Sequence, residues 1–580
     1  SNIGSFLALL SFPYVFEPLF ELPRMGLFWT IGFWLFAVLE IVVVYFLMRD
    51  ADSTIEHSVT KHSVMVETAA EALMRPSILD RVGWVGLPAI ASLTLIAATD
   101  HVSHEIAPEP RIWVFTLCLY LLTFIICFDH PFWYRRGITC AITVMTIMLL
   151  SGRESIPGWF GLAIDFGVFE LRWSHFITMF LICFVCHGEL VRLRPTAAEY
   201  LTEFYLYLSF GGACGGLFVT LVATNYFNDY YEWFLCLEAG LGISLSVLAG
   251  VIRSWRKAPM RIDIKTLAVV GMIFLLLGGT VYFWQDPFKL MQQTSDDFDS
   301  TRLHQSRNFY GAVSVRDLVH HTDPRENYRI FYSGPITHGL QFTHSDRVTT
   351  PAAYYSLGSG VGETLEYAKS NYPSIRVAIV GLGAGTLANY ARQSDHYDFY
   401  EINPDVIRIA NEKFDNLRLC KAQKQMTILG DARLKLDQSA SDVLYDVIAL
   451  DAFSGGSVPI HLLTKEAFAI YRKHLKPNGF MVANITNGYL NLYPVLKRQA
   501  EHLVMGFRYK SDAPKSSLRI RRSKYFIITD DKDYLSQYPS ANSKYYDANG
   551  TLIHEEDPEI PGVPLWSDHF CSINAIELKD

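Results

Sequence analysis

Long apolar runs alternate with short polar stretches over roughly the first half of the chain. A helix needs about 20 consecutive apolar residues to cross the hydrocarbon layer, where its own backbone must satisfy all backbone hydrogen bonds. We therefore expect seven to nine transmembrane helices of about 20 residues each. The clearest runs are Gly26–Met48, Val82–Thr99, Ile112–Phe128, His175–Glu189, Tyr205–Phe227, Trp233–Ile252 and Thr266–Trp284, and two weaker runs are Ile3–Phe20 and Ile138–Ser151.

Beyond Gln285 the pattern changes to short apolar runs that alternate with amphipathic stretches. The runs in RVAIVGLGAG, HYDFYEI, QMTILGDAR and YDVIALDAF predict four strands separated by helices, which is typical of a parallel, doubly wound sheet. The predicted fold class is an α-helical transmembrane bundle followed by an α/β Rossmann-like domain with a mostly parallel sheet and a small N-terminal β element. The predicted boundaries are 1–285 for the bundle, 286–355 for a linker with the β-rich element, and 356–580 for the Rossmann-like domain.

Composition agrees with a membrane-bound chain, because 50% of the residues are hydrophobic and only 19% are charged. The net charge is -8, and no basic stripe with interleaved aromatic residues is present, so nucleic acid is not an expected partner. Arg- and Lys-rich connections fall on one side if all nine runs cross, and that side should be cytoplasmic. The second half then emerges on the opposite face, which conflicts with a supply of cytoplasmic metabolites, so its side stays open.

The small residues of SFGGACGGLF, Ser209–Phe218, predict a place where two helices approach closely. Tight packing is favoured there over any role in binding a ligand.

A glycine-rich loop follows the first predicted strand and spells Gly381-Leu-Gly383-Ala384-Gly385-Thr386. Such a loop, between a strand and a helical stretch, indicates a nucleotide site. Thr386 stands where the dinucleotide fingerprint has its third glycine, so NAD is disfavoured. A lone glycine loop is weak evidence, and it gains weight here from the acids that follow.

Three carboxylates stand at the ends of the next three predicted strands. Glu401 ends the second strand, where a carboxylate can accept hydrogen bonds from both hydroxyls of a ribose. Asp431 ends the third strand, where it can accept from an adenine amino group, and Asp451 ends the fourth. The alternative for each acid is an ordinary helix cap, because strand-to-helix loops favour Asp at that position. Together they predict a site for an adenosine that bears a cation.

The motifs GLGAG, YEINPDVIRIA, GDAR, YDVIALDAF and LLTKEAFAIYRKHLKPNGFMVANI resemble the spermidine synthase family of S-adenosylmethionine-type Rossmann enzymes. The motifs RNFYGAV, THGLQF, TPAAYYSLGSG and PLWSDHF, with SNIGSFLALLSFPYVFEP at the start, resemble the membrane-fused branch of that family. The resemblance covers nearly the whole chain and suggests that relatives have further residues before Ser1.

The resemblance implies a catalytic role for Asp451, which matches the acid that holds the attacking amine in aminopropyltransferases. It implies that Tyr355 and Gln341 flank the reactive arm of the ligand, and it assigns no role to His338. It implies no metal, and no cofactor beyond S-adenosylmethionine as substrate. The residues implied to bind this ligand are Gly381, Gly383, Ala384, Gly385, Glu401, Ile402, Asp431 and Ala432.

Two departures from the family pattern bear on the substrate. Aminopropyltransferases usually have Asp at the position of Ala384, where it holds the amino group of decarboxylated S-adenosylmethionine, and a second acid at the position of Ser454. A diamine pocket needs carboxylates, because desolvating an unpaired ammonium costs several kcal/mol. An intact amino acid tail is therefore the better candidate at this end of the site.

The preferred hypothesis is a membrane-anchored enzyme that cyclises S-adenosylmethionine, releasing 5'-methylthioadenosine and homoserine lactone. The first alternative is a polyamine aminopropyltransferase that uses other acids, such as Glu363 or Asp568, for the amine. The second alternative is a polyamine transporter or sensor with a regulatory Rossmann domain. Methyl transfer is disfavoured by the resemblance. The expected partners are the small-molecule substrate and the lipid bilayer, and the expected location is the bacterial inner membrane.

Overall fold

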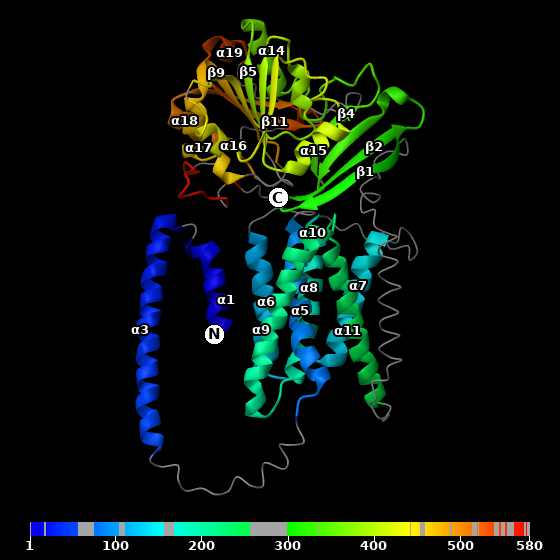
Figure 1. Ribbon diagram of the computed structural model, residues 1–580, viewed down its shortest axis with the longest axis vertical. Coiled ribbons are helices and arrows are strands. Elements are labelled where there is room, and N and C mark those ends of the chain that lie inside the picture. The colour runs from blue at the N-terminus through cyan, green and yellow to red at the C-terminus, as the bar shows by residue number, and fades with distance from the viewer. Residues whose placement is uncertain are drawn as a thin grey trace. The chain divides into compact units, whose positions relative to one another are not determined.

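The computed structural model describes residues 2–16, 19–55, 75–103, 111–155, 168–255 and 298–576, the last range without 335, 441, 453–458, 488–489, 513–518, 520, 539–544, 547–551, 554–561 and 574–575. The chain divides into two units, Ser1–Met291 and Gln292–Asp580. Figure 1 shows that the described part of the first unit is helical, whereas the second contains strands and helices.

The first unit consists of helices built from the apolar runs. Its described helices are α1 (Asn2–Ser11), α3 (Leu22–Ile55), α5 (Ile78–His101), α6 (Arg111–Asp129), α7 (Arg136–Ser155), α8 (Val168–Arg192), α9 (Leu201–Leu217), α10 (Thr224–Tyr226) and α11 (Tyr231–Trp255), with the short turns η1 (Phe12–Phe16), η3 (Ala198–Tyr200) and η4 (Phe218–Ala223). Six spans in the described residues are long and apolar enough to cross a membrane.

These six spans confirm six of the predicted runs, which lie in α3, α5, α6, α8, α9 with α10, and α11. The weaker run Ile138–Ser151 lies in α7, whose apolar part, Arg136–Leu150, is shorter. The described part of the run Ile3–Phe20 contains the short helix α1 and the turn η1. The predicted run Thr266–Trp284 lies outside the described residues.

Helices α5 and α9 approach each other closely at two glycines. A Cβ atom at Gly211 would overlap the carbonyl oxygen of Val85, and one at Gly215 would overlap the carbonyl oxygen of Ala89. Gly212, between them, has no atom within 4 Å of such a Cβ. The small residues of this segment therefore bring two backbones together, as the sequence predicted.

We expect Gly215→Ala to destabilise the membrane unit by about 1–3 kcal/mol, because the new methyl group must displace backbone rather than a flexible side chain. The measurement is the midpoint of thermal unfolding of the detergent-solubilised chain. Gly212→Ala is the matched control, and it should leave the midpoint unchanged or raise it, because Ala is the better helix former. Equal midpoints for the two variants would contradict the close approach.

The second unit contains two larger sheets and the helices that cover one of them. Its strands are β1 (Phe298–Asn308), β2 (Gly311–His320), β3 (Tyr328–Ser333), β4 (Ile336–Phe342), β5 (Arg376–Val380), β6 (His396–Glu401), β7 (Lys424–Leu429), β8 (Tyr445–Leu450), β9 (Leu475–Asn484), β10 (Gly506–Asp512), β11 (Ser523–Thr529), β12 (Tyr545–Tyr546) and β13 (Leu552–Ile553). Its helices are α14 (Gly360–Asn371), α15 (Pro404–Lys413), α16 (Ala432–Asp437), α17 (Lys465–Lys473), α18 (Tyr493–Leu503) and α19 (Lys532–Gln537), with the short turns η5 (Pro324–Glu326), η6 (Thr386–Tyr390) and η7 (Ile460–Leu462).

The larger sheet has seven strands in the order β10-β11-β9-β8-β5-β6-β7. Strands β9, β8, β5, β6 and β7 are parallel, whereas β11 runs antiparallel to both of its neighbours. The four strands predicted from the sequence are β5, β6, β7 and β8. The predicted fold class, a helical bundle followed by an α/β domain with a mostly parallel sheet, is confirmed.

Both faces of this sheet are buried, which explains the continuous apolar runs of its strands. Val377 and Ile379 of β5 point into one hydrophobic cluster, with residues of α14, α15 and α19. Ala378 and Val380 point into a second cluster, with residues of α16, α17 and α18. Alternate side chains of one strand thus hold helices on opposite faces, so the sheet is doubly wound.

The small β element is an antiparallel sheet of four strands in the order β1-β2-β3-β4. Its last two strands contain an irregularity, since Phe331 pairs with Gly339 but the next residue, Tyr332, pairs with Thr337. His338 therefore has no residue opposite it and is the extra residue of a β-bulge. Bulges turn a side chain away from the regular alternation, often beside a functional site.

Candidate functional site

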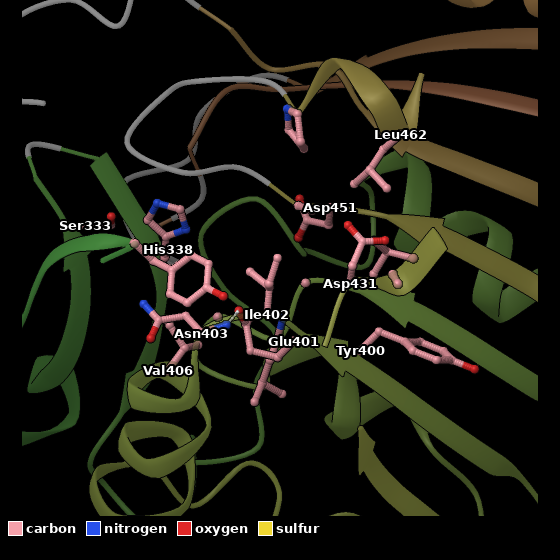
Figure 2. A pocket seen from close by; sticks show the side chains of 18 of the residues that line it. Ser333, His338, Tyr400, Glu401, Ile402, Asn403, Val406, Asp431, Asp451 and Leu462 are labelled. Carbon is pink, nitrogen blue, oxygen red and sulfur yellow. Dashed lines mark hydrogen bonds between the residues drawn. The ribbon is translucent and has the colours of Figure 1, made fainter. Parts of the chain in front are cut away.

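A cavity opens at the carboxyl ends of β5, β6, β7 and β8, bounded on another side by the small sheet (Figure 2). This is where ligands bind in doubly wound folds. The strand order brings together residues that are far apart in the chain. The sequence-predicted residues that line the cavity are Tyr355, Gly381, Gly383, Glu401, Ile402, Asp431, Ala432 and Asp451.

The glycine loop is held by backbone contacts that leave no space for side chains. Gly381 has φ of +100°, and a Cβ atom there would overlap the backbone oxygen of Asp451. Gly383 has φ of +51°, and a Cβ atom there would overlap the backbone oxygen of His338. Only glycine fits these two positions, and the bare backbone lies open to the cavity. The helical stretch expected after the loop is the short 3-10 helix η6, with Gly385 at its N-cap.

Glu401 ends β6 and connects the glycine loop to the next helix. One carboxylate oxygen accepts from the backbone N–H of Leu382 at 3.0 Å, and the other accepts from that of Asn403 at 2.8 Å. Burial raises the pKa of Glu401, and these backbone hydrogen bonds act in the opposite direction. The carboxylate still lines the cavity, so it can hold the loop and contact a ligand with its remaining lone pairs.

Asp431 is the N-cap residue of α16, as the helix-cap alternative proposed. Its Oδ1 accepts from the backbone N–H of Leu434 at 2.9 Å. Its Oδ2 lies 2.7 Å from Nε2 of His461, a residue of η7. Both Asp431 and His461 line the cavity, so a cap and a ligand contact are compatible here. No local sequence pattern marks His461, which comes close only through folding.

Asp451 follows β8 and is held by two neutral side chains. Its Oδ1 accepts from the side-chain amide of Asn484 at 2.8 Å, and Tyr355 donates a second hydrogen bond. Desolvation raises the pKa of Asp451 to about 6, although both hydrogen bonds lower it. Burial raises the pKa of Tyr355 well above its ordinary value, so its phenol stays protonated and donates. The site therefore holds a carboxylate whose proton affinity suits a general base near neutral pH.

Gln341, Ala384 and Gly385 lie outside the cavity lining, although all three were predicted to contact the ligand. The Gln341 amide donates to Asn416 Oδ1 at 3.0 Å and accepts from the backbone N–H of Asp415 at 2.9 Å. Asn416 in turn donates to the backbone oxygen of Ala384 at 2.8 Å. Gln341 thus supports the glycine loop through Asn416 rather than facing the cavity. The Ala384 side chain is 1% exposed and packs against Gly339.

The two substitute acids considered for an amine acceptor also lie outside the cavity lining. Glu363 forms ion pairs with Arg508 at 2.9 Å and with Lys510 at 2.8 Å. Asp568 pairs with Arg433 at 2.6 Å, and this ion pair lowers its pKa. Ser454 falls outside the described residues. Within the described lining, the carboxylates are Glu401, Asp431 and Asp451.

The fold and the cavity define a Rossmann-like α/β protein joined to a set of membrane-type helices. Among known proteins, the chain is similar to a polyamine aminopropyltransferase of Vibrio vulnificus, with 33% identity over 113 residues, or 19% of this chain and 37% of that protein. It is also similar to a probable polyamine aminopropyl transferase of Bifidobacterium longum, with 35% identity over 195 residues, or 32% of this chain and 38% of that protein. These similarities bear out the resemblance to the spermidine synthase family.

The matches are partial, because the aligned regions span well under half the length of these two relatives. A solved structure of a probable spermidine synthase from Corynebacterium glutamicum is 16% identical, with a TM-score of 0.32, and covers 43% of this chain and 83% of that one. No family model matches the chain.

Proposed function

We propose that the chain is a membrane-anchored aminopropyltransferase-type enzyme that moves a three-carbon amine chain from an S-adenosyl sulfonium to an amine acceptor. The observation that carries the proposal is the Asp451 carboxylate, which lines the cavity and has a pKa of about 6. The named relatives are aminopropyltransferases, which supports the same class of reaction. The bacterial inner membrane is the proposed location.

The order of the strands supports one orientation of the ligand. Neighbouring strands β7, β6, β5 and β8 present Asp431, Glu401, the glycine loop and Asp451 in that order. An adenosine with its base at Asp431 and its ribose hydroxyls at Glu401 has its sulfur at the glycine loop. The carbon chain beyond sulfur then lies near Asp451, where the acceptor must attack.

In the proposed reaction, the acceptor nitrogen attacks the chain carbon bonded to sulfur. A carbon–nitrogen bond forms, the carbon–sulfur bond breaks, and its electron pair neutralises the sulfonium, which leaves as 5'-methylthioadenosine. Asp451 accepts the proton that the attacking amine loses, while Tyr355 and Asn484 fix the direction of its lone pairs. The attack is unimolecular once both substrates are bound, so positioning supplies much of the rate.

Cyclisation of intact S-adenosylmethionine is the second candidate, and the scarcity of acids among the described residues near the tail favours it. Position 384 is Ala, and Glu363 and Asp568 are paired with basic side chains outside the cavity lining. In this reaction a carboxylate oxygen of the ligand attacks its own γ-carbon. The carbon–sulfur bond breaks, and homoserine lactone and 5'-methylthioadenosine are released without a second substrate.

Product analysis separates the candidates. The purified full chain is incubated with S-adenosylmethionine or its decarboxylated form, with and without putrescine, and 5'-methylthioadenosine is quantified by mass spectrometry. Aminopropyl transfer requires the decarboxylated donor and the amine together. Cyclisation gives methylthioadenosine and lactone from S-adenosylmethionine alone. Tight binding without either product would contradict both and favour the sensor or transporter alternative.

The proposed base predicts a pH profile. Asp451 must be deprotonated to accept a proton. We therefore expect kcat/KM to be at its maximum above the pKa of Asp451 and to fall as the pH drops through about 6. Tyr355→Phe removes a hydrogen bond that lowers this pKa, so the break should move to higher pH by about one unit. Tyr354→Phe is the matched control, because the Tyr354 hydroxyl bonds Arg521 and has only an electrostatic interaction with Asp451, so the break should move less than in Tyr355→Phe. A break that is unmoved in Tyr355→Phe would argue against Asp451 as the base.

A further inference from the structure

The wall of the cavity opposite Asp451 comes from the small sheet and carries no acid among the described lining residues. It includes Val313 of β2, Phe331 and Ser333 of β3, and His338 of β4. In Figure 2 the His338 imidazole lies on this wall beside Ser333, with Asp451 across the cavity. On this wall the imidazole of His338, when neutral, offers one ring nitrogen as a hydrogen-bond donor and the other as an acceptor.

The position of His338 is fixed by the glycine loop. Its backbone oxygen accepts from the N–H of Ala384 at 3.2 Å. At the next residue, Gly339, a Cβ atom would lie only 2.7 Å from that of Ala384, so the strand and the loop are in direct contact. The bulge at His338 turns the imidazole out of the regular alternation at this point. The side chain therefore lines the cavity beside the segment that faces the sulfur of the ligand.

The imidazole of His338 is neutral, and one of its ring nitrogens makes no hydrogen bond to the described part of the protein. Burial lowers the pKa of His338 to about 4. Its Nε2 is buried and has no hydrogen-bond partner among the described residues. A buried polar atom without a partner costs free energy, so such an atom beside a ligand cavity indicates a bond that the ligand completes. A neutral imidazole can donate to a carboxylate, whereas an aspartate would repel it.

We propose that His338 is a specificity-determining residue that binds the tail of the S-adenosyl ligand beyond the sulfur and makes the site accept a tail that carries a carboxylate. The inference rests on the proposed function, in that the cavity must hold an S-adenosyl ligand. Aminopropyl transfer uses a donor without this carboxylate, so a preference for the carboxylate tail would favour the second candidate, cyclisation of intact S-adenosylmethionine.

Three stable thioethers test the role of His338 by calorimetry on the full chain in detergent. They are 5'-methylthioadenosine, which has no tail, S-adenosylhomocysteine, which has an amino acid tail, and decarboxylated S-adenosylhomocysteine. His338→Ala should weaken binding of S-adenosylhomocysteine about tenfold and leave methylthioadenosine unchanged, because one hydrogen bond to the tail is lost. His338→Gln should restore part of the affinity. His338→Asp should reverse the preference, in favour of the decarboxylated ligand.

Thr337→Val is the matched control, since Thr337 is a buried residue of the same strand that lies outside the cavity lining. It should leave the ratio of the three affinities unchanged. If His338→Ala weakens all three ligands equally, or if His338→Asp does not change the preference, the inference is wrong. If wild-type protein binds none of the three, the proposed function itself fails, so the two failures are distinguishable.

Discussion

Asp451→Asn is expected to lower kcat about 10³-fold while the affinity for 5'-methylthioadenosine stays within about twofold, because general base catalysis typically contributes 10²–10⁴-fold. The amide retains the size of the carboxylate, and its oxygen can still accept from Asn484, one of the two side chains that hold Asp451 in place. It cannot take a proton from an attacking amine. The measurement is the rate of methylthioadenosine release under saturating substrates, with calorimetry of product binding alongside.

Two further variants sharpen this result. Asn484→Asp places a second carboxylate 2.8 Å from Asp451 in the wild-type geometry, so it should raise the pKa of the pair and move the acid limb of the pH profile upward. Asp568→Asn changes an acid outside the cavity lining and should leave kcat within about twofold of the wild type. If Asp451→Asn turned over at the wild-type rate, Asp451 would be only a structural residue.

Glu401→Gln is expected to weaken binding of 5'-methylthioadenosine about 100-fold, equivalent to about 2.8 kcal/mol. Both oxygens of Glu401 accept backbone N–H groups, from Leu382 and from Asn403. A glutamine amide has one oxygen, so its NH₂ group would face a backbone donor at one of these positions. The substitution therefore disturbs the glycine loop and removes an acceptor for the ribose hydroxyls. Calorimetric titration with methylthioadenosine measures the loss.

Glu412→Gln is the control for this variant, since Glu412 is an exposed residue of α15 outside the cavity lining. It should bind methylthioadenosine as the wild type does. If Glu401→Gln bound with wild-type affinity and kept its fold by circular dichroism, the ribose assignment would be wrong.

The pattern of hydrophobic residues alone predicted the helices and strands that are formed by continuous apolar runs. Six membrane-type spans and the strands β5, β6, β7 and β8 follow from it, because long apolar runs are typical of membrane helices and short apolar runs between turns are typical of buried strands. Acids at the ends of parallel strands meet at one edge of the sheet, so the sequence sufficed to place Glu401, Asp431 and Asp451 together.

Contacts that depend on register could not be predicted in this way. The bulge that presents His338 arises from how β3 pairs with β4, and no local residue pattern marks it. Asn484 reaches Asp451 because β9 lies beside β8 in the sheet. From the family resemblance Gln341 was expected to flank the ligand, yet its amide bonds Asn416 within the protein. Neutral side chains acquire such roles from neighbours that are distant in sequence.

The glycine contacts between α5 and α9 limit how the membrane unit can change shape. Carbonyl oxygens of Val85 and Ala89 lie against the bare Cα atoms of Gly211 and Gly215. Sliding one helix along the other would bring bulkier neighbours into the same narrow gap, so these two helices must travel together in any rearrangement. Cross-links between α5 and α9 should therefore leave activity unchanged. Cross-links that join α5 to other helices would show whether the helices must move relative to one another during turnover.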